Sequence, residues 1–208
     1  MKKLIKSLMV ALALLASGAV FAAEAGKDYT MLIPARPAST QKIEVLEFFF
    51  YGCSHCFHLH GSLGTWEKNM PKDVELTLVP TVFRASWEPM ASTYYALEAL
   101  GKLHPLHDAL FQAWNVERIE LMEESQIADF VAARGVDRNK FSSAYGSFSV
   151  QSKVARAKQM LRSYAIQSTP TIVVDGKYVI NGLQPAETIR VLNDVIALAR
   201  KERGAGKR

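Results

Sequence analysis

The sequence predicts an α/β fold in which a block of helices is inserted between two groups of strands. β-prone segments lie before residue 85 and again after residue 170, and a long stretch with helical periodicity separates them. Apolar runs bounded by Gly and Pro indicate the strands, and apolar residues at helical spacing indicate the insertion. The 208 residues suffice for one domain that carries such an insertion.

Residues 1–22 predict a secretory signal peptide. Lys2, Lys3 and Lys6 precede an apolar run from Leu8 to Leu15, and small residues lead up to Ala23. This pattern is typical of a cleaved leader. A membrane anchor is the alternative, but the run is shorter than the roughly 20 apolar residues that span a bilayer. We therefore expect an exported, soluble protein.

The charge distribution argues against a nucleic-acid partner. Residues 1–22 carry +3 and residues 200–208 carry +4 of the net charge of +5, which leaves −2 for residues 23–199. A nucleic-acid-binding protein should carry its basic charge on the folded body. We expect residues 201–208 to form a disordered basic tail.

The first strands and the first helix are predicted from local composition. Tyr29–Ile33 predicts a short strand, and Ile43–Tyr51 ("IEVLEFFFY") predicts a central strand covered on both faces, because it is almost continuously apolar. Gly52 interrupts this run, and a helix is expected to start near Cys53. Val74–Phe83 predicts the next strand.

The helical pattern runs from about residue 86 to residue 165. Gly101 and Gly135 follow two of its periodic segments and fit helix C-termini, and Pro105 fits the first turn of another helix. Asp175-Gly176 separates two short β-prone runs and predicts a hairpin. Residues 185–201 carry one apolar stripe and predict a final helix.

The chain has two cysteines, Cys53 and Cys56, in the segment "FFFYGCSHCFHLH". A disulfide that closes two intervening residues constrains the unfolded chain little, so the pair is better explained by reactivity than by stability. The start of a helix favours an anion, which should lower the pKa of Cys53 and make it the attacking sulfur. Cys56 lies one turn further on the same face and can close a reversible disulfide.

A metal site is the alternative for this segment. Cys53, Cys56 and His60 share one helical face and offer three ligands for copper or zinc. Structural zinc usually takes four ligands, and His104 and His107 are expected to lie far away in the helical block. Redox chemistry is therefore favoured over metal binding and over an inert buried pair.

Two segments together resemble the thioredoxin fold: "FFFYGCSHC" after an apolar strand and "STPTIVVDGKYVING" before the last helix. With the intervening helices, the leader and the C-x-H-C dipeptide, the chain resembles the DsbA family of periplasmic disulfide oxidoreductases from Tyr29 to Arg200. The resemblance implies a thioredoxin-like domain formed by residues 23–85 and 166–200, with a helical insertion at residues 86–165.

The resemblance also implies roles for single residues. Cys53 matches the exposed nucleophile, Cys56 the buried resolving cysteine, and His55 the dipeptide histidine that stabilises the thiolate. Pro170 matches a loop proline that is cis in this fold and packs against the disulfide, and Thr169 before it would offer its backbone to an extended substrate.

Two further positions complete the implied site. Glu47 matches an acid beneath the active site that helps proton movement at the resolving cysteine; a solvated strand edge is the alternative. Ser54 stands where the family commonly has proline, and we expect it to face the substrate near the thiolate. Because this dipeptide sets the redox poise, the sequence leaves the reduction potential open.

The implied function is that of a thiol:disulfide oxidoreductase that introduces disulfide bonds into newly exported proteins. Its expected partners are reduced, unfolded secreted proteins and a DsbB-like membrane quinone reductase that reoxidises it. We expect a monomer without a cofactor in the periplasm of a Gram-negative bacterium. A reductase or isomerase is an alternative, although the segment before Ile43 has no room for the dimerisation domain that such isomerases usually add. An exported copper- or zinc-binding protein is the other.

Overall fold

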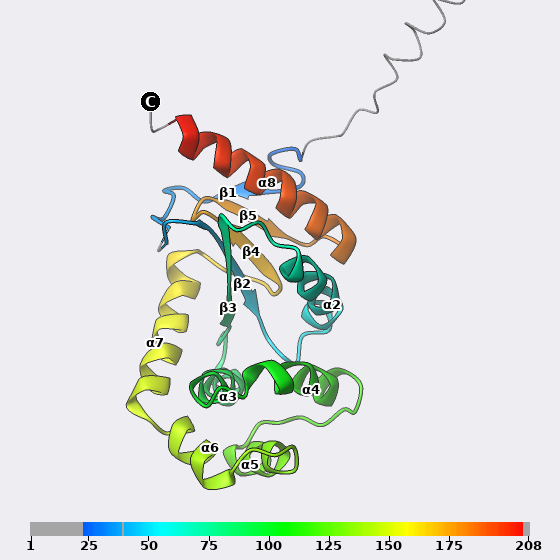
Figure 1. The fold of residues 1–208 in the computed structure, drawn as a ribbon, viewed down its shortest axis with the longest axis vertical. Coiled ribbons are helices and arrows are strands. Elements are labelled where there is room, and N and C mark those ends of the chain that lie inside the picture. Colours follow the sequence, from blue (N-terminus) through cyan, green and yellow to red (C-terminus); the bar gives the residue numbers. More distant parts are fainter. Residues whose placement is uncertain (1–22, 39, 206–208) are drawn as a thin grey trace, which may run out of the picture.

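The computed structural model describes residues 23–38 and 40–205 (Figure 1), so the predicted signal peptide lies outside the described residues. The centre of the fold is a five-stranded sheet in the order β1-β5-β4-β2-β3. β2 pairs in parallel with β3 and antiparallel with β4, and the other pairs are antiparallel. The strands are β1 (Thr30–Met31), β2 (Ile43–Phe49), β3 (Val74–Pro80), β4 (Thr171–Val174) and β5 (Tyr178–Asn181).

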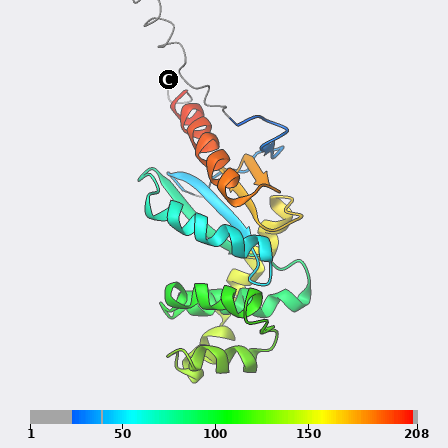
Figure 2. The ribbon, with the colours of Figure 1, turned by 90° about the vertical axis from the view of Figure 1, so that its right-hand side faces the viewer.

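Helices cover both faces of this sheet and extend beyond one end of it (Figures 1 and 2). α2 and α8 share a core with one face, α7 packs on the other, and α3 to α6 form a block beyond the end of β2. The helices are α2 (Ser54–Lys68), the 3₁₀ helix η1 (Ala85–Trp87), α3 (Glu88–Ala99), α4 (Leu103–Asn115), α5 (Glu124–Ala132), α6 (Arg138–Tyr145), α7 (Phe148–Ser163) and α8 (Pro185–Ala205). The predicted order of elements is confirmed.

β2 is buried over all seven of its residues, as its apolar run predicts. Side chains alternate between the two faces of a strand. Ile43 and Val45 therefore join the core beneath α2 and α8, whereas Leu46 and Phe48 join the core beneath α7. The strand ends in the core of the helical block, where Phe49 is buried, and so the chain enters α2 at the junction of sheet and helices.

The C-terminal tail differs from its prediction. Residues 201–205 were expected to be disordered, but α8 continues to Ala205. The reason is a set of ion pairs with the body of the protein. Arg203 pairs with Asp175 and donates a hydrogen bond to the Gln41 carbonyl, and Lys177 Nζ lies 2.7 Å from the Glu202 carboxylate. Within residues 23–38 and 40–205, no helix combines the length and the apolar content needed to cross a membrane.

The predicted hairpin at Asp175-Gly176 is confirmed, and its second residue is tightly enclosed. Asp175 and Gly176 have φ values of 54° and 65°, as a two-residue turn of this kind requires. The Gly176 carbonyl accepts a 2.7 Å hydrogen bond from the Arg36 N–H, and a Cβ on Gly176 would lie 2.0 Å from the Arg36 carbonyl oxygen. The turn therefore fixes the segment that leads from β1 to β2.

We predict that Gly176→Ala destabilises the protein more than Gly182→Ala does. Gly182 also has a positive φ, of 70°, but a Cβ there meets no atom within 4 Å. The left-handed backbone costs a non-glycine residue about 1–2 kcal/mol at either site, and the collision with Arg36 should add about 1–3 kcal/mol at Gly176 alone. Urea unfolding of both variants measures the difference, and equal losses would contradict the close approach of Arg36.

Candidate active site

Cys53 is the N-cap residue of α2, held by a tight turn at the end of β2. The Cys53 N–H donates a 3.0 Å hydrogen bond to the Phe50 carbonyl. Gly52 within this turn has no room for a side chain, because a Cβ would lie 2.5 Å from Phe50 Cε1 and 2.7 Å from Trp114 Cε3. The turn therefore presents the Cys53 sulfur at the start of the helix, where backbone N–H groups favour an anion.

The two thiols, both unpaired in this structure, have very different surroundings. Cys53 is partly exposed, whereas Cys56 is 0 % exposed. The pKa of Cys53 is lowered to about 5. The main cause is the hydrogen bond from the Cys56 thiol, burial opposes the shift, and hydrogen bonds with Thr169 and with the backbone N–H groups of Cys56 and His55 add to the lowering. Burial first, and then the neighbouring Cys53 sulfur, raise the pKa of Cys56 far above its usual range. One sulfur is a thiolate at neutral pH and the other is a thiol.

The loop before β4 lies against the accessible sulfur. Cys53 Sγ is 3.3 Å from the Thr169 carbonyl oxygen, a contact between residues 116 positions apart. The Thr169–Pro170 peptide is cis, as expected. The Thr171 hydroxyl donates a 2.8 Å hydrogen bond to the Ser168 carbonyl and holds the loop in place. The structure thus brings the Thr169 carbonyl to Cys53, with Pro170 following it in the same loop.

Glu47 is a buried acid on the α2 side of β2. It follows Ile43 and Val45 on the same face, and its exposed fraction is 4 %. Burial, then the nearby Cys53 sulfur and Glu67, raise the pKa of Glu47 to about 8. The alternative of a solvated strand edge is therefore wrong. Glu47 is also one of the charges that raise the pKa of Cys56, so this acid and the buried thiol are electrostatically coupled.

Ser54 and His55 form the exposed first turn of α2. Both residues are exposed, next to the partly exposed Cys53. The His55 backbone N–H contributes to the low pKa of Cys53. The backbone at the start of the helix, rather than the imidazole, therefore supplies this hydrogen bond.

His60 and His107 lie together, contrary to the expectation that His107 is remote. Their ring centroids are 4.9 Å apart. His60 Nε2 is hydrogen-bonded to the Asp108 carboxylate, and His107 Nδ1 lies 2.7 Å from the Tyr51 hydroxyl. Burial lowers the pKa of His107 to about 3, so its ring is neutral. This network ties α2 to α4 beneath the active-site turn.

The metal alternative has no geometric support. Among the residues that the structure describes, no group of three or more His, Cys, Asp or Glu side chains could hold a metal ion. His60, the third ligand of the metal alternative beside Cys53 and Cys56, is turned toward Asp108 in α4 instead.

The helical block contributes aromatic and amide groups to the turn that local sequence patterns do not predict. Phe50 stacks on Trp87 with ring centroids 3.8 Å apart, and Trp114 packs against Phe50 edge-on. Asn115 donates hydrogen bonds of 2.8 Å and 2.9 Å to the carbonyls of Tyr51 and Phe111. These partners lie more than 30 residues from the turn in the sequence, and nothing in local spacing marks them.

Comparisons with known proteins agree with this geometry. Residues 59–192 match the family model described as a DSBA-like thioredoxin domain. A thiol:disulfide interchange protein DsbA from Burkholderia cepacia is 38 % identical over 183 residues, covering 86 % of each chain. One from Pseudomonas aeruginosa is 36 % identical over 214 residues and covers both chains completely.

Solved structures give the same result for the fold. The crystal structure of Pseudomonas aeruginosa DsbA superposes with a TM-score of 0.82 at 35 % identity and covers 89 % of this chain and 97 % of that one. Oxidoreductase DsbA from Xylella fastidiosa superposes with a TM-score of 0.79 at 32 % identity, covering 85 % and 97 %. The strands and helices described above therefore form a DsbA-like thioredoxin fold.

We predict that Glu47→Gln stabilises the reduced protein increasingly as the pH rises. The pKa of Glu47 is about 8 in the folded protein and near 4.5 when unfolded, so the wild type loses stability as the pH rises through this window. A glutamine amide mimics the protonated acid and avoids this loss, which is at most ~5 kcal/mol. Urea unfolding at pH 5, 6.5 and 8.5 under a reductant measures the difference. The Cys53 thiolate is present in both proteins, and its repulsion of the Glu47 carboxylate is part of the loss that glutamine avoids.

The matched control is Glu120→Gln, which removes an exposed carboxylate. Its stability difference from the wild type should stay constant across the same pH range. If the Glu47→Gln and Glu120→Gln differences have the same pH dependence, Glu47 is not held protonated by burial.

Proposed function

Because this chain belongs to the DsbA family and is a thiol:disulfide oxidoreductase of the thioredoxin fold, we propose that it donates its Cys53–Cys56 disulfide to newly exported proteins. The observation that carries the proposal is that the two sulfurs differ in pKa and in burial. The pKa of accessible Cys53 is lowered to about 5, and Cys56 beneath it is buried and protonated. A low pKa stabilises the reduced enzyme and makes Cys53 a good leaving group, so the disulfide is an oxidant.

The first step is attack by a substrate thiolate on the Cys53 sulfur of the oxidised enzyme. The Cys53–Cys56 bond breaks, a mixed disulfide forms at Cys53, and Cys56 leaves as a thiolate. A buried thiolate is costly, so it needs a proton at once. Glu47 is the proposed donor, because its pKa of about 8 keeps it protonated at neutral pH and its charge is coupled to Cys56.

The second step releases the product. A second substrate thiolate attacks the substrate sulfur of the mixed disulfide, and Cys53 leaves as a stabilised thiolate. The substrate gains a disulfide, and the enzyme holds the two electrons as one thiolate and one thiol. On reoxidation Cys56 must lose its proton again, for which the Glu47 carboxylate is the proposed acceptor.

Substrate binding is assigned to the groups around Cys53. The Thr169 backbone and Pro170 would receive an extended segment beside the sulfur, as the 3.3 Å contact between Thr169 and Cys53 supports. Ser54 and His55 are exposed on the other side of the thiolate and would contact the same segment. Residues 86–165, the inserted block, support the turn from below.

The remaining assignments follow from family membership. Residues 1–22 are the proposed signal peptide, and the periplasm of a Gram-negative bacterium is the proposed location. Reduced, unfolded secreted proteins are the proposed substrates, and a DsbB-like membrane quinone reductase is the proposed reoxidant. We expect the enzyme to act as a monomer without a cofactor. Residues 23–85 and 166–200 form the proposed catalytic domain.

The first prediction for this function concerns Cys56→Ala. This variant cannot form the Cys53–Cys56 disulfide, but its Cys53 thiolate can attack a disulfide of an exported protein, whose second sulfur leaves as a thiolate. The resulting mixed disulfides should accumulate, because no Cys56 thiol is present to attack them and release the substrate. Non-reducing gels and mass spectrometry of periplasmic extracts detect the adducts. Cys53→Ala is the matched control and should form none. A folded, abundant Cys56→Ala protein without adducts would count against the mechanism.

The second prediction concerns His55→Ala. Alanine keeps the backbone N–H that lowers the pKa of Cys53 but removes the imidazole. If the imidazole also stabilises the thiolate, the pKa of Cys53 should rise and the reduction potential should fall together. The reduction potential should fall by about 30 mV for each unit by which the pKa of Cys53 rises, since each corresponds to about 1.4 kcal/mol. This relation holds at a pH above the Cys53 pKa of both the wild type and the variant.

Thiolate absorbance measures the pKa, and equilibration with glutathione measures the potential. The wild-type potential also separates a disulfide donor from a reductase, whose equilibrium favours the oxidised form. Should both quantities stay unchanged in His55→Ala, the helix start alone stabilises the thiolate and His55 has no tuning role.

A further inference from the structure

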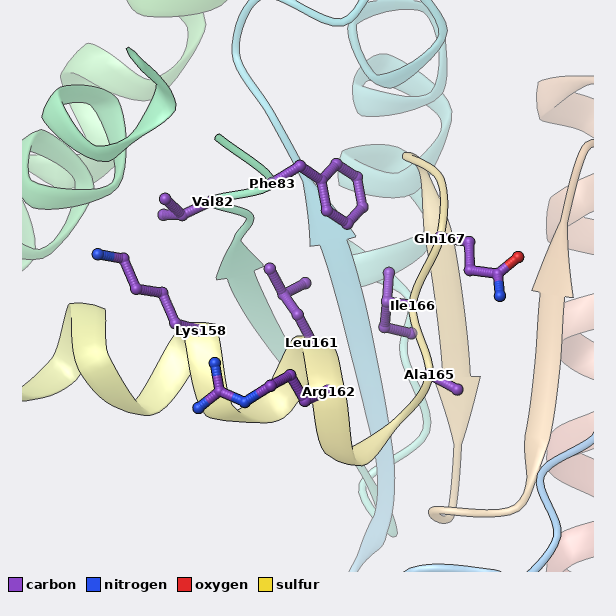
Figure 3. A pocket seen from close by; sticks show the side chains of 8 residues that line it. All are labelled: Val82, Phe83, Lys158, Leu161, Arg162, Ala165, Ile166 and Gln167. Atoms are coloured by element: carbon purple, nitrogen blue, oxygen red, sulfur yellow. The ribbon is translucent and has the colours of Figure 1, made fainter. Parts of the chain in front are cut away.

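A cavity of about 420 Å³ lies between the end of α7 and the loop that follows β3 (Figure 3). Val82 and Phe83 form one wall, and Leu161 and Ile166 form the other. Phe83 is 41 % exposed, although it is a large apolar residue. The cavity thus offers apolar surface on both sides to a side chain that enters from solvent.

This cavity borders the loop that carries the substrate edge proposed above. Gln167 lines it and stands two positions before Thr169, whose carbonyl lies 3.3 Å from Cys53 Sγ. An extended chain advances about 3.3 Å per residue, so two residues span about 7 Å. Within the described ranges, the Gln167 N–H and C=O make no backbone hydrogen bond and are available to a paired strand. A peptide bonded to Cys53 that follows this edge therefore passes over the cavity.

The charge at the cavity is positive and only half compensated. Lys158 lines it and pairs with Glu88 at 2.5 Å, outside the cavity wall. Arg162 also lines it, and its guanidinium has no hydrogen-bond or ion-pair partner in the part of the chain that the structure describes. No Asp or Glu belongs to the described lining. An incoming carboxylate would therefore meet the Arg162 cation and no competing anion from that lining.

We propose that this cavity is a specificity subsite for the substrate polypeptide. It takes an apolar side chain together with a neighbouring carboxylate, two or three residues from the cysteine that bonds to Cys53. Arg162 pairs with the carboxylate, and Phe83 covers the apolar side chain. The inference rests on the proposed function, because the peptide is positioned by its bond to Cys53.

The test is a competition between peptides for Cys53 in the reduced Cys56→Ala chain. Two extended peptides with a single cysteine, each activated as its glutathione disulfide, are mixed in equal amounts. The two peptides differ only at the third residue from the cysteine, which is Glu in one and Lys in the other. Two such pairs are tested: in one pair this residue precedes the cysteine, and in the other pair it follows the cysteine. The Cys53 thiolate attacks the peptide sulfur, glutathione leaves as a thiol, and mass spectrometry gives the ratio of the two adducts.

We expect the Glu-to-Lys adduct ratio of one pair to fall about threefold or more when Arg162→Glu is added, as for the reversal of an exposed ion pair, and more so at low salt. Arg156→Glu makes the same charge change on an exposed position of α7 outside the cavity and should alter the ratio little. In a second set, the peptides carry Phe or Ala at the neighbouring position, and the Phe-to-Ala adduct ratio should fall when Phe83→Ala is added. Phe148→Ala is its control, because Phe148 lies outside the cavity, at the start of α7, and is 88 % exposed.

The outcomes separate this inference from the proposed function. If the Cys56→Ala chain forms no adduct with any peptide, the proposed function fails and the subsite fails with it. Adducts whose Glu-to-Lys ratio is the same with and without Arg162→Glu would overturn the subsite alone. An equal response to Arg156→Glu would also overturn it, because general attraction by the surface would then explain the preference.

Discussion

The burial of Cys56 directly behind Cys53 is the constraint on which the rest of the site depends. The two sulfurs are three residues apart on one helical turn, yet one faces solvent and the other is completely covered. The tight turn at Gly52 produces this arrangement, because it sets where α2 starts relative to the end of β2. The thiol of Cys56 then donates to the sulfur of Cys53, so the buried residue creates the reactivity of the exposed one.

The same arrangement explains why the protein retains an acid in its core. Glu47 occupies a fully buried strand position at which an apolar residue would be cheaper. Burial disfavours the ionised carboxylate and raises the pKa of Glu47 to about 8, so the acid holds a proton that it can exchange near neutral pH. In the proposed mechanism, the buried thiol of Cys56 gains and loses a proton in each cycle, and Glu47 is the nearby titratable group that would exchange it.

Local patterns in the sequence predicted most of the elements and the reactive pair. The continuous apolar run of Ile43–Tyr51 and the turn at Asp175-Gly176 act within a few residues, so their structure could be inferred without the rest of the chain. The pairing of His60 with Asp108 could not, because it depends on how α4 docks against α2. The helical end of the tail likewise depends on ion pairs of Arg203 with residues far away in the sequence.

The helical insertion therefore has a physical reason that the reactive motif alone does not reveal. A turn that places a thiolate in solvent must stay rigid although it is a loop, and its own few residues supply little packing. Trp87 and Trp114 pack on Phe50, and Asn115 holds the Tyr51 carbonyl, so the inserted helices supply that rigidity. The loop before Pro170 closes the other side of Cys53 with a backbone carbonyl. A backbone carbonyl is the same whatever side chain precedes the proline, so the proposed cavity beside α7 adds the side-chain discrimination that the Thr169 carbonyl itself does not supply.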